Sequence, residues 1–281
     1  MKDNLIYFNA YRYLLIPQEY IQMNFVDGIS DRKELEAKKN YFFMESVYSL
    51  KEINLYDEKF QIINNNNDVL LMKIGIKKQT VIGTPELLDQ RMDDWRSLYV
   101  IFSFSRQLIL IQHKMKIVAD TKSIVNRLIR ILAPRMRQRS LNLQINQIAR
   151  KNLFWEIVRK NPGRVKEVSF ILTAPNFADI TKHLGDELRE AMRSVQAARS
   201  KITLGGDGSS VLSLSENNVG IANLAEYAEQ GGGSFSIKLS NMKRKTSKDG
   251  AKELSVAALE MEGPASAVLE TAKRLFEDAE N

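Results

Sequence analysis

The chain has 281 residues, of which 44% are hydrophobic and 27% charged, and it contains 14 glycines, 6 prolines and no cysteine. This composition is typical of a globular protein and excludes collagenous and proline-rich classes. The absence of cysteine excludes disulfide frameworks, thiolate metal sites and cysteine nucleophiles. The sequence has neither a secretory signal pattern nor a run of about 18 uncharged apolar residues, so we expect a cytoplasmic protein.

The net charge of +7 is concentrated in one part of the chain. Residues 105–170 contain 15 basic and three acidic side chains, a balance of +12, so the rest of the chain sums to −5. Protein surfaces usually mix the two signs, and a block of this size therefore indicates an acidic partner such as nucleic acid. The alternative is a solvated basic face without a partner.

The first half of the chain predicts both strands and helices. The four asparagines at 64–67 should form a hairpin tip, because asparagine tolerates the left-handed conformation. Pro134 should end the helix before it, because proline lacks an N–H. Asn142, Gln144 and Asn146 alternate with apolar residues and should face outward from a strand. In chain order the patterns predict a strand over 5–15, a helix over 32–50, a hairpin with its tip at 64–67, a short helix from Thr84 to Trp95, strands over 97–104 and 106–114, a helix over 121–133, a strand over 141–146 and a helix that stops at Asn161-Pro162-Gly163.

The second half predicts strands that alternate with helices. The strands are expected over 165–173, 201–204, 210–214, 234–240 and 253–260, and the helices over 177–199, over 219–230 and from Pro264 onward. Asn161-Pro162-Gly163 is the predicted domain boundary. We therefore expect an α+β fold, with an N-terminal mixed domain of antiparallel strands (1–161) and a small C-terminal α/β sandwich (162–281).

Enzyme motifs are nearly absent. The sequence has no phosphate-binding loop, no glycine-rich dinucleotide motif, and no zinc-protease or serine-hydrolase motif. Only two histidines occur, His113 and His183, and Arg106 and His113 lie on a predicted strand, although their spacing is that of a helical ribonuclease family. Glu36-Ala37-Lys38 and Asp57-Glu58-Lys59 fit the pattern of a magnesium-dependent nuclease, but such short matches arise by chance. We predict no catalytic residue, no metal and no cofactor, with a nuclease as the alternative.

The +12 segment carries the clearest functional signal. Arginine outnumbers lysine there, and its planar fork suits phosphate, while neighbouring amides can bond to phosphate, sugar or base edges. No aromatic residue interrupts this stripe, which favours contact with a duplex backbone over base stacking. A basic loop at 243–248 adds a second contact. The predicted nucleic-acid-binding residues are Lys122, Arg127, Arg130, Arg135, Arg137, Arg139, Asn142, Gln144, Arg150, Lys151, Lys243, Arg244 and Lys245.

The layout of the chain also resembles a known group of proteins. The stretches WEIV (155–158) and PGRVKEVSFILTAPN (162–176), the strand pair at 97–114 and the helix with Lys122, Arg127 and Arg130 are similar in arrangement to prokaryotic phage-defence proteins of the RexA and KwaB type. The resemblance implies a cytoplasmic two-domain protein without an obvious catalytic centre. It further implies sequence-tolerant DNA binding, a homodimer and a membrane-protein partner encoded beside it. It transfers no site residue.

The leading hypothesis is a non-catalytic, sequence-tolerant DNA-binding protein that acts in anti-phage defence, with duplex DNA favoured. The rival hypotheses are a metal-dependent nuclease and a basic module that docks an acidic protein. The apolar strands at 98–104 and 108–112 could leave a sheet edge that needs cover, and closed twofold dimers are the commonest oligomers, so we predict a homodimer.

Overall fold

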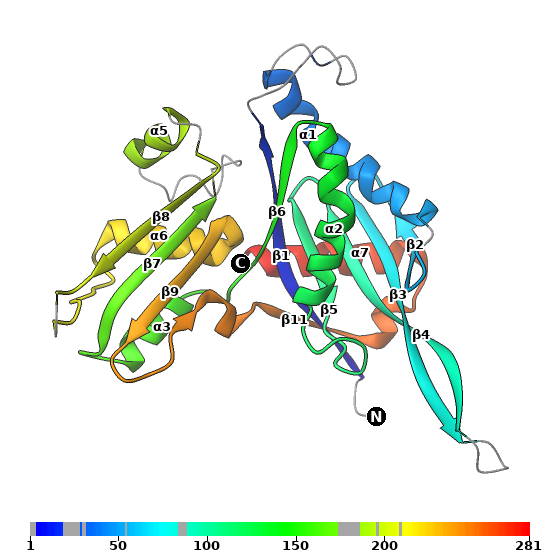
Figure 1. The fold of residues 1–281 in the computed structure, drawn as a ribbon. Coiled ribbons are helices and arrows are strands. Elements are labelled where there is room, and N and C mark those ends of the chain that lie inside the picture. The colour runs from blue at the N-terminus through cyan, green and yellow to red at the C-terminus, as the bar shows by residue number, and fades with distance from the viewer. Residues whose placement is uncertain are drawn as a thin grey trace.

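The computed structural model describes residues 4–18, 29, 32–53, 55–83, 89–173, 186–194, 197–207 and 210–281. It contains two antiparallel sheets with helices packed on them, so the α+β class is confirmed. We call the part built on the seven-stranded sheet the first unit and the part built on the four-stranded sheet the second unit (Figure 1).

The first unit is organised around one long strand. In the order of the sheet, β11, β1, β5, β4, β3 and β2 lie side by side, and β6 pairs with the second half of β1. The first half of β1 pairs with β11 on one side and with β5 on the other. These strands are β1 (Leu5–Pro17), β2 (Glu58–Asn65), β3 (Val69–Gly83), β4 (Asp89–Ser103), β5 (Leu108–Gln112), β6 (Leu141–Gln147) and β11 (Glu253–Ala257).

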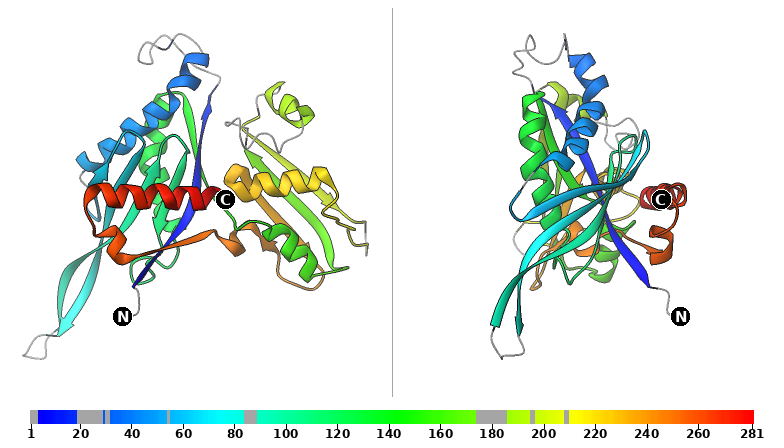
Figure 2. Two further views of the ribbon diagram at one scale, coloured as in Figure 1. Left: turned by 180° about the vertical axis from the view of Figure 1, so that it is seen from behind. Right: turned by 90° about the vertical axis from the view of Figure 1, so that its right-hand side faces the viewer.

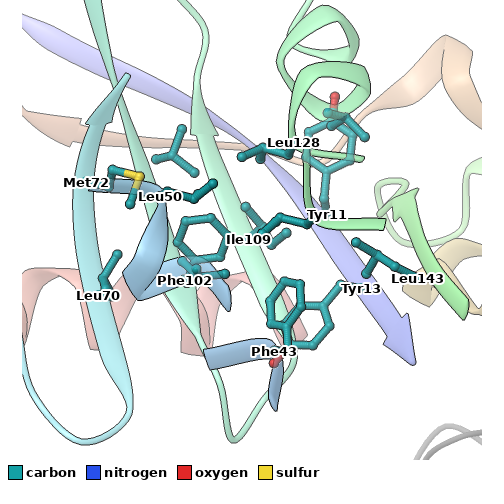
Figure 3. Close-up of a cluster of buried hydrophobic side chains, with 14 of the residues drawn as sticks. Tyr11, Tyr13, Phe43, Leu50, Leu70, Met72, Phe102, Ile109, Leu128 and Leu143 are labelled. Carbon is teal, nitrogen blue, oxygen red and sulfur yellow. The ribbon is translucent and has the colours of Figure 1, made fainter. Parts of the chain in front are cut away.

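Two helices, α1 (Arg32–Tyr48) and α2 (Lys122–Gln138), cover one face of this sheet. Tyr13 stacks on Phe43 of α1 with ring centroids 4.0 Å apart, and Leu128 of α2 is fully buried in the same cluster (Figure 3). Burying such side chains contributes about 1.5–3 kcal/mol each, so this cluster is the main core of the first unit.

The opposite face of the sheet is covered by the C-terminal part of the chain. Strand β11 pairs with β1 in register Leu5↔Ala257, and helix α7 (Ala265–Glu280) packs Leu275 and Phe276 against that face. A short helical turn, η5 (Ala258–Met261), connects the two. The segment 251–281 therefore lies in the first unit, whereas the sequence boundaries place it in the C-terminal domain. Helix α3 (Leu153–Lys160) is the reverse case. The sequence boundaries place it in the N-terminal domain, but its core residues belong to the second unit.

The second unit is a contiguous insertion, from about Ala149 to Gly250, between β6 and β11. Its sheet has the order β10-β9-β7-β8, and Phe154 on α3 packs against Phe170 and Phe235 in its core. Helices α3 and α6 lie on the same face of the sheet (Figures 1 and 2). The elements are α3 (Leu153–Lys160), β7 (Val165–Thr173), α5 (Asp186–Ser194), β8 (Arg199–Gly205), α6 (Val219–Tyr227), the π-helical turn η3 (Ala228–Gly232), β9 (Gly233–Leu239), β10 (Lys245–Thr246) and the 3-10 turn η4 (Ser247–Gly250).

Three expected elements differ in the structure. The expected helix from Thr84 to Trp95 is wrong from Asp89 onward: residues 89–103 form one strand, paired with β3 as far as Gly83↔Asp89, and residues 84–88 lie outside the described residues. The resulting hairpin arm projects from the sheet (Figure 1). The expected strand at 210–214 has no ladder partner, and of the expected helix 177–199 only Asp186–Ser194 is described as helix, with Arg199 already in β8.

Helix α2 does not end before Pro134. It continues to Gln138, because Met136 is fully buried in the main core and its packing offsets the loss of a backbone hydrogen bond. We expect Pro134→Ala to raise the free energy of unfolding by about 1 kcal/mol, since alanine restores an N–H for the Arg130 carbonyl and removes the ring clash. Urea unfolding followed by circular dichroism measures this. A midpoint that stays the same or falls would show that the proline costs this helix nothing.

A buried carboxylate joins η3 to α3 within the second unit. Glu229 of η3 is 7% exposed, and its two oxygens accept hydrogen bonds from the backbone N–H groups of Asn152 (2.9 Å) and Phe154 (2.8 Å). These are free donors at the start of α3, so Glu229 caps that helix from a distance. Arg12 of β1 donates to the carbonyl of Gln230 at 2.7 Å, which ties η3 to the first sheet.

Candidate anion-binding surface

Two arginines of α2 that the sequence assigns to phosphate are paired with a buried carboxylate. Glu58 begins β2, and its side chain is fully buried. Its Oε1 accepts a hydrogen bond from Arg127 and another from Arg130 at 2.7 Å, and Asp57 lies 4.0 Å from Arg127. Glu58 therefore neutralises part of the charge that the sequence analysis counts as available.

The arginines at the end of α2 point in different directions. Because the helix continues, Arg135 and Arg139 lie on one face and Arg137 lies about 200° away from each of them. Arg135 donates to the hydroxyl of Ser49 at 2.5 Å, and Arg139 forms an ion pair with Glu45 at 3.6 Å. Arg137 is exposed. The expected alternating stripe does not form, because it requires an extended chain.

The amides of β6 face the second unit rather than solvent. Gln144 is 6% exposed, and its Oε1 accepts hydrogen bonds from Thr173 (3.1 Å) and from Arg199 (3.2 Å). Asn146 donates to Thr173 at 3.5 Å, and Asn142 is half-buried. The expectation of an outward polar row is thus wrong for Gln144, because the second unit packs against this edge strand.

The remaining predicted residues divide into paired and exposed groups. Arg150 forms an ion pair with Glu156 at 2.6 Å, and Arg244 forms one with Glu167 at 3.0 Å. Lys245 is half-buried in β10. The exposed lysines of the set are Lys122, Lys151 and Lys243.

A cleft lies between the two units, and we call it the junction cleft. It has a volume of about 250 Å³ and is lined from the first unit by α2 and β6 and from the second by β7, β8, β9 and η4. Three cations line it, and none of the described residues on its walls is acidic. They are Lys122, Arg199 and Lys248. Clefts between units are a common location of binding sites.

Two of these lysines carry their charges close together. The Lys122 ammonium lowers the pKa of Lys248, and partial burial adds to this effect, while the nearby Asp120 opposes it. Like charges in contact are unfavourable unless an anion neutralises them. The pair is therefore suited to an anionic ligand.

Helices α3 and α6 cover one face of the second sheet (Figure 1). The opposite face lies beside the junction cleft, and we call it the open face. Paired residues of antiparallel strands point to the same side, so the register assigns its members directly. Ile171 pairs with Lys201 and with Ser234, and Ser169 pairs with Thr203 and Ser236. The face carries Thr173, Arg199, Ile171, Lys201, Ser234, Ser169, Thr203, Ser236, Glu167 and Lys238, with Arg244 bound to Glu167. It faces the viewer in Figure 1.

The rival catalytic patterns have other partners in the fold. Glu58 of the Asp57-Glu58-Lys59 match is held by arginine, and Lys59 lies 4.4 Å from the ring of Trp95. Arg106 bonds to Glu280, and His113 lies 3.4 Å from Glu253, at the other end of β5. Within the described ranges no three acidic or histidine side chains gather as a metal site would need. His183 lies outside the described residues.

Sequence reasoning places Lys122 correctly at the start of α2 and includes Lys248 in the basic loop at 243–248, but it omits Arg199, Lys201 and Lys238 from the candidate surface. A usable signal was present: β9 alternates serine and lysine with large apolar residues, a pattern that predicts one polar face. No known family model matches the chain, and no curated protein matches it. None of the helices among the described residues combines the length and apolar character that crossing a membrane requires.

Proposed function

We propose that the protein binds duplex nucleic acid through the phosphate backbone, with little sequence preference, on the open face and the rim of the junction cleft. The observation that supports this most is the charge balance along this side of the molecule. Among the described residues, the cleft lining and the open face together carry six cations and one acidic residue, Glu167, and Asp120 lies close to Lys248. The cations are Lys122, Arg199, Lys201, Lys238, Arg244 and Lys248.

The dimensions of the face suit a duplex. Thr173, opposite Arg199, and Glu167, opposite Lys238, are six residues apart on β7, which is a distance of about 20 Å along a strand. That distance equals the axial rise of about six base pairs. Serine and threonine hydroxyls between the cations can donate to phosphate oxygens, and no residue of the open face is aromatic, so base stacking has no platform.

The test is a charge reversal on the open face. We expect Lys201→Glu/Lys238→Glu to weaken binding to a labelled duplex of about 20 base pairs by about 10-fold or more at roughly 50 mM salt, because two phosphate contacts become repulsive. The plot of log affinity against log salt should become shallower by about two units. Fluorescence polarisation with two unrelated duplex sequences measures both effects, which should be alike for the two sequences.

A matched control reverses two charges on α7, on the other side of the molecule (Figure 2). Lys273→Glu/Arg274→Glu makes the same change in net charge and should keep most of the wild-type affinity and slope. If the two double variants weaken binding equally, the attraction follows net charge alone and the open face is not the site. If the wild-type protein binds no duplex at low salt, the surface is a docking face for an acidic protein instead.

The wider biological role rests on other grounds. A part in anti-phage defence and a membrane-protein partner are proposed on the resemblance of layout alone. The homodimer is proposed on that resemblance alone, because the apolar strands β4 and β5 lie inside the first sheet and leave no edge to cover. A dimer would double the cationic surface that a duplex can contact.

A further inference from the structure

The junction cleft reaches polar groups that a duplex cannot contact. Gln144 lines the cleft although it is 6% exposed, and the cleft volume is about 250 Å³. The grooves of a duplex alone are about 6–12 Å wide, so a duplex can meet the rim but cannot enter. Pockets for drug-sized ligands start at about 300 Å³, which places this cleft in the range of a small molecule that stays partly exposed.

The polar lining consists mainly of donors. Thr173 and Arg199 both donate to the carbonyl oxygen of Gln144, which leaves the amide N–H groups of this residue open to the cleft. A ligand oxygen in the cleft could therefore accept a hydrogen bond from this amide donor. Together with Lys122 and Lys248, this donor selects a ligand rich in oxygen acceptors.

Part of the lining is apolar. Branched aliphatic side chains from α2, β6 and β7 line the cleft with the cations. They are Val125, Ile129, Ile145 and Ile171. A free inorganic ion would leave this wall in contact with water, whereas a ligand with an apolar body would cover it. The lining therefore fits an anionic group attached to a flat or apolar body.

We propose that the junction cleft binds a small phosphorylated ligand of the mononucleotide class, with its phosphate among Lys122, Lys248 and Arg199 and its body against the aliphatic wall. This inference goes beyond duplex binding on the open face and does not depend on it. Because the lining comes from both units, a bound ligand would bridge them and stabilise their contact.

The test uses adenosine 5′-monophosphate as the probe, with adenosine and inorganic phosphate for comparison. We expect titration calorimetry to show binding of the nucleotide, binding of inorganic phosphate at least about 10-fold weaker, and no measurable binding of adenosine. Thermal unfolding should shift upward with the nucleotide concentration. Lys122→Gln/Lys248→Gln changes two exposed side chains and should weaken nucleotide binding by about 10-fold or more, since charged hydrogen bonds are lost.

Gln144→Leu removes the amide donors that face the cleft, at nearly constant volume, and should weaken nucleotide binding by a similar factor. If it fails to fold, the double lysine variant still decides the question. The variant Lys201→Glu/Lys238→Glu should weaken duplex binding and leave nucleotide affinity within about twofold, so the two proposals can fail separately.

Three results would overturn the inference. The wild-type protein binds neither the nucleotide nor phosphate; adenosine binds as tightly as its monophosphate; or Lys122→Gln/Lys248→Gln keeps the wild-type affinity. Equal affinities for inorganic phosphate and the nucleotide would overturn the part assigned to the aliphatic wall.

Discussion

Replacing Arg127 by alanine is expected to lower the free energy of unfolding by about 3 kcal/mol. The Glu58 side chain is fully buried, and its Oε2 has no hydrogen-bond partner among the described residues. Without Arg127 the carboxylate depends on Arg130, whose side chain is 60% exposed and whose attraction is screened by solvent. Breaking a buried ion pair on one side typically costs about 3–5 kcal/mol. The urea midpoint, followed by tryptophan fluorescence, measures the loss.

Two variants on the same helix are the controls. Arg130→Ala should cost about 1 kcal/mol or less because the lost contact is exposed, and Arg137→Ala should cost almost nothing. Equal midpoints for Arg127→Ala and Arg137→Ala would contradict the structural role of the Glu58 pair. A large loss for Arg127→Ala would also show that this arginine, although it belongs to the +12 segment, is bound to Glu58 and is not free to contact phosphate.

Removal of the buried carboxylate that holds α3 to η3 should be equally severe. Glu229→Ala leaves the N–H groups of Asn152 and Phe154 without acceptors in a buried position, and each such loss costs about 1–3 kcal/mol. We expect a decrease of about 3 kcal/mol in the free energy of unfolding. Glu229→Gln keeps one of the two acceptors at the same volume and should lower the free energy of unfolding at pH 7 by about 1–2 kcal/mol, less than Glu229→Ala does.

The same carboxylate predicts a pH dependence. Burial raises the pKa of Glu229, against the opposing effect of its hydrogen bonds from Phe154 and Asn152, and the charge of Glu226 raises it further. The folded protein therefore holds this proton more tightly than the unfolded chain does. The stability that Glu229 contributes is complete below its usual pKa and decreases as the pH rises through the raised value. We expect the free energy of unfolding of the wild type to fall relative to that of Glu229→Gln between pH 4 and pH 7. Urea unfolding at several pH values measures both proteins, and a difference between them that stays constant with pH would refute the prediction.

Local patterns predict most elements but not where they pack. The Asn64–Asn67 hairpin tip and the strand at 5–17 follow from local residue preferences, and both are present. The end of α2 could not be predicted, because the burial of Met136 against the sheet outweighs the local cost of Pro134. The arm of β3 and β4 was missed since its strand identity comes from pairing with β3 across the hairpin rather than from its own sequence.

The candidate surface was predictable only in part, for the same reason. A count of charges along the chain does not show which arginines have acidic partners, and Glu58 lies 69 residues from Arg127 in sequence. Nor does it show that Gln144 is buried against Thr173. Arg199 and Lys248 come from segments of nearly neutral composition, so their approach to Lys122 becomes visible only when the two units are in contact.

The return of the chain to its first sheet has a consequence during synthesis on the ribosome. Leu5 pairs with Ala257, so the first half of β1 has no partner on that side until residues 253–257 have been translated, whereas β6 can pair with the second half earlier. The apolar surface that α7 later covers, with Phe8 and Leu110, stays exposed to solvent until then. The inserted second unit is contiguous and can form its own sheet earlier. The slow, long-range step is thus the closure of the first sheet, and nascent chains are open to aggregation or chaperone capture over most of their synthesis.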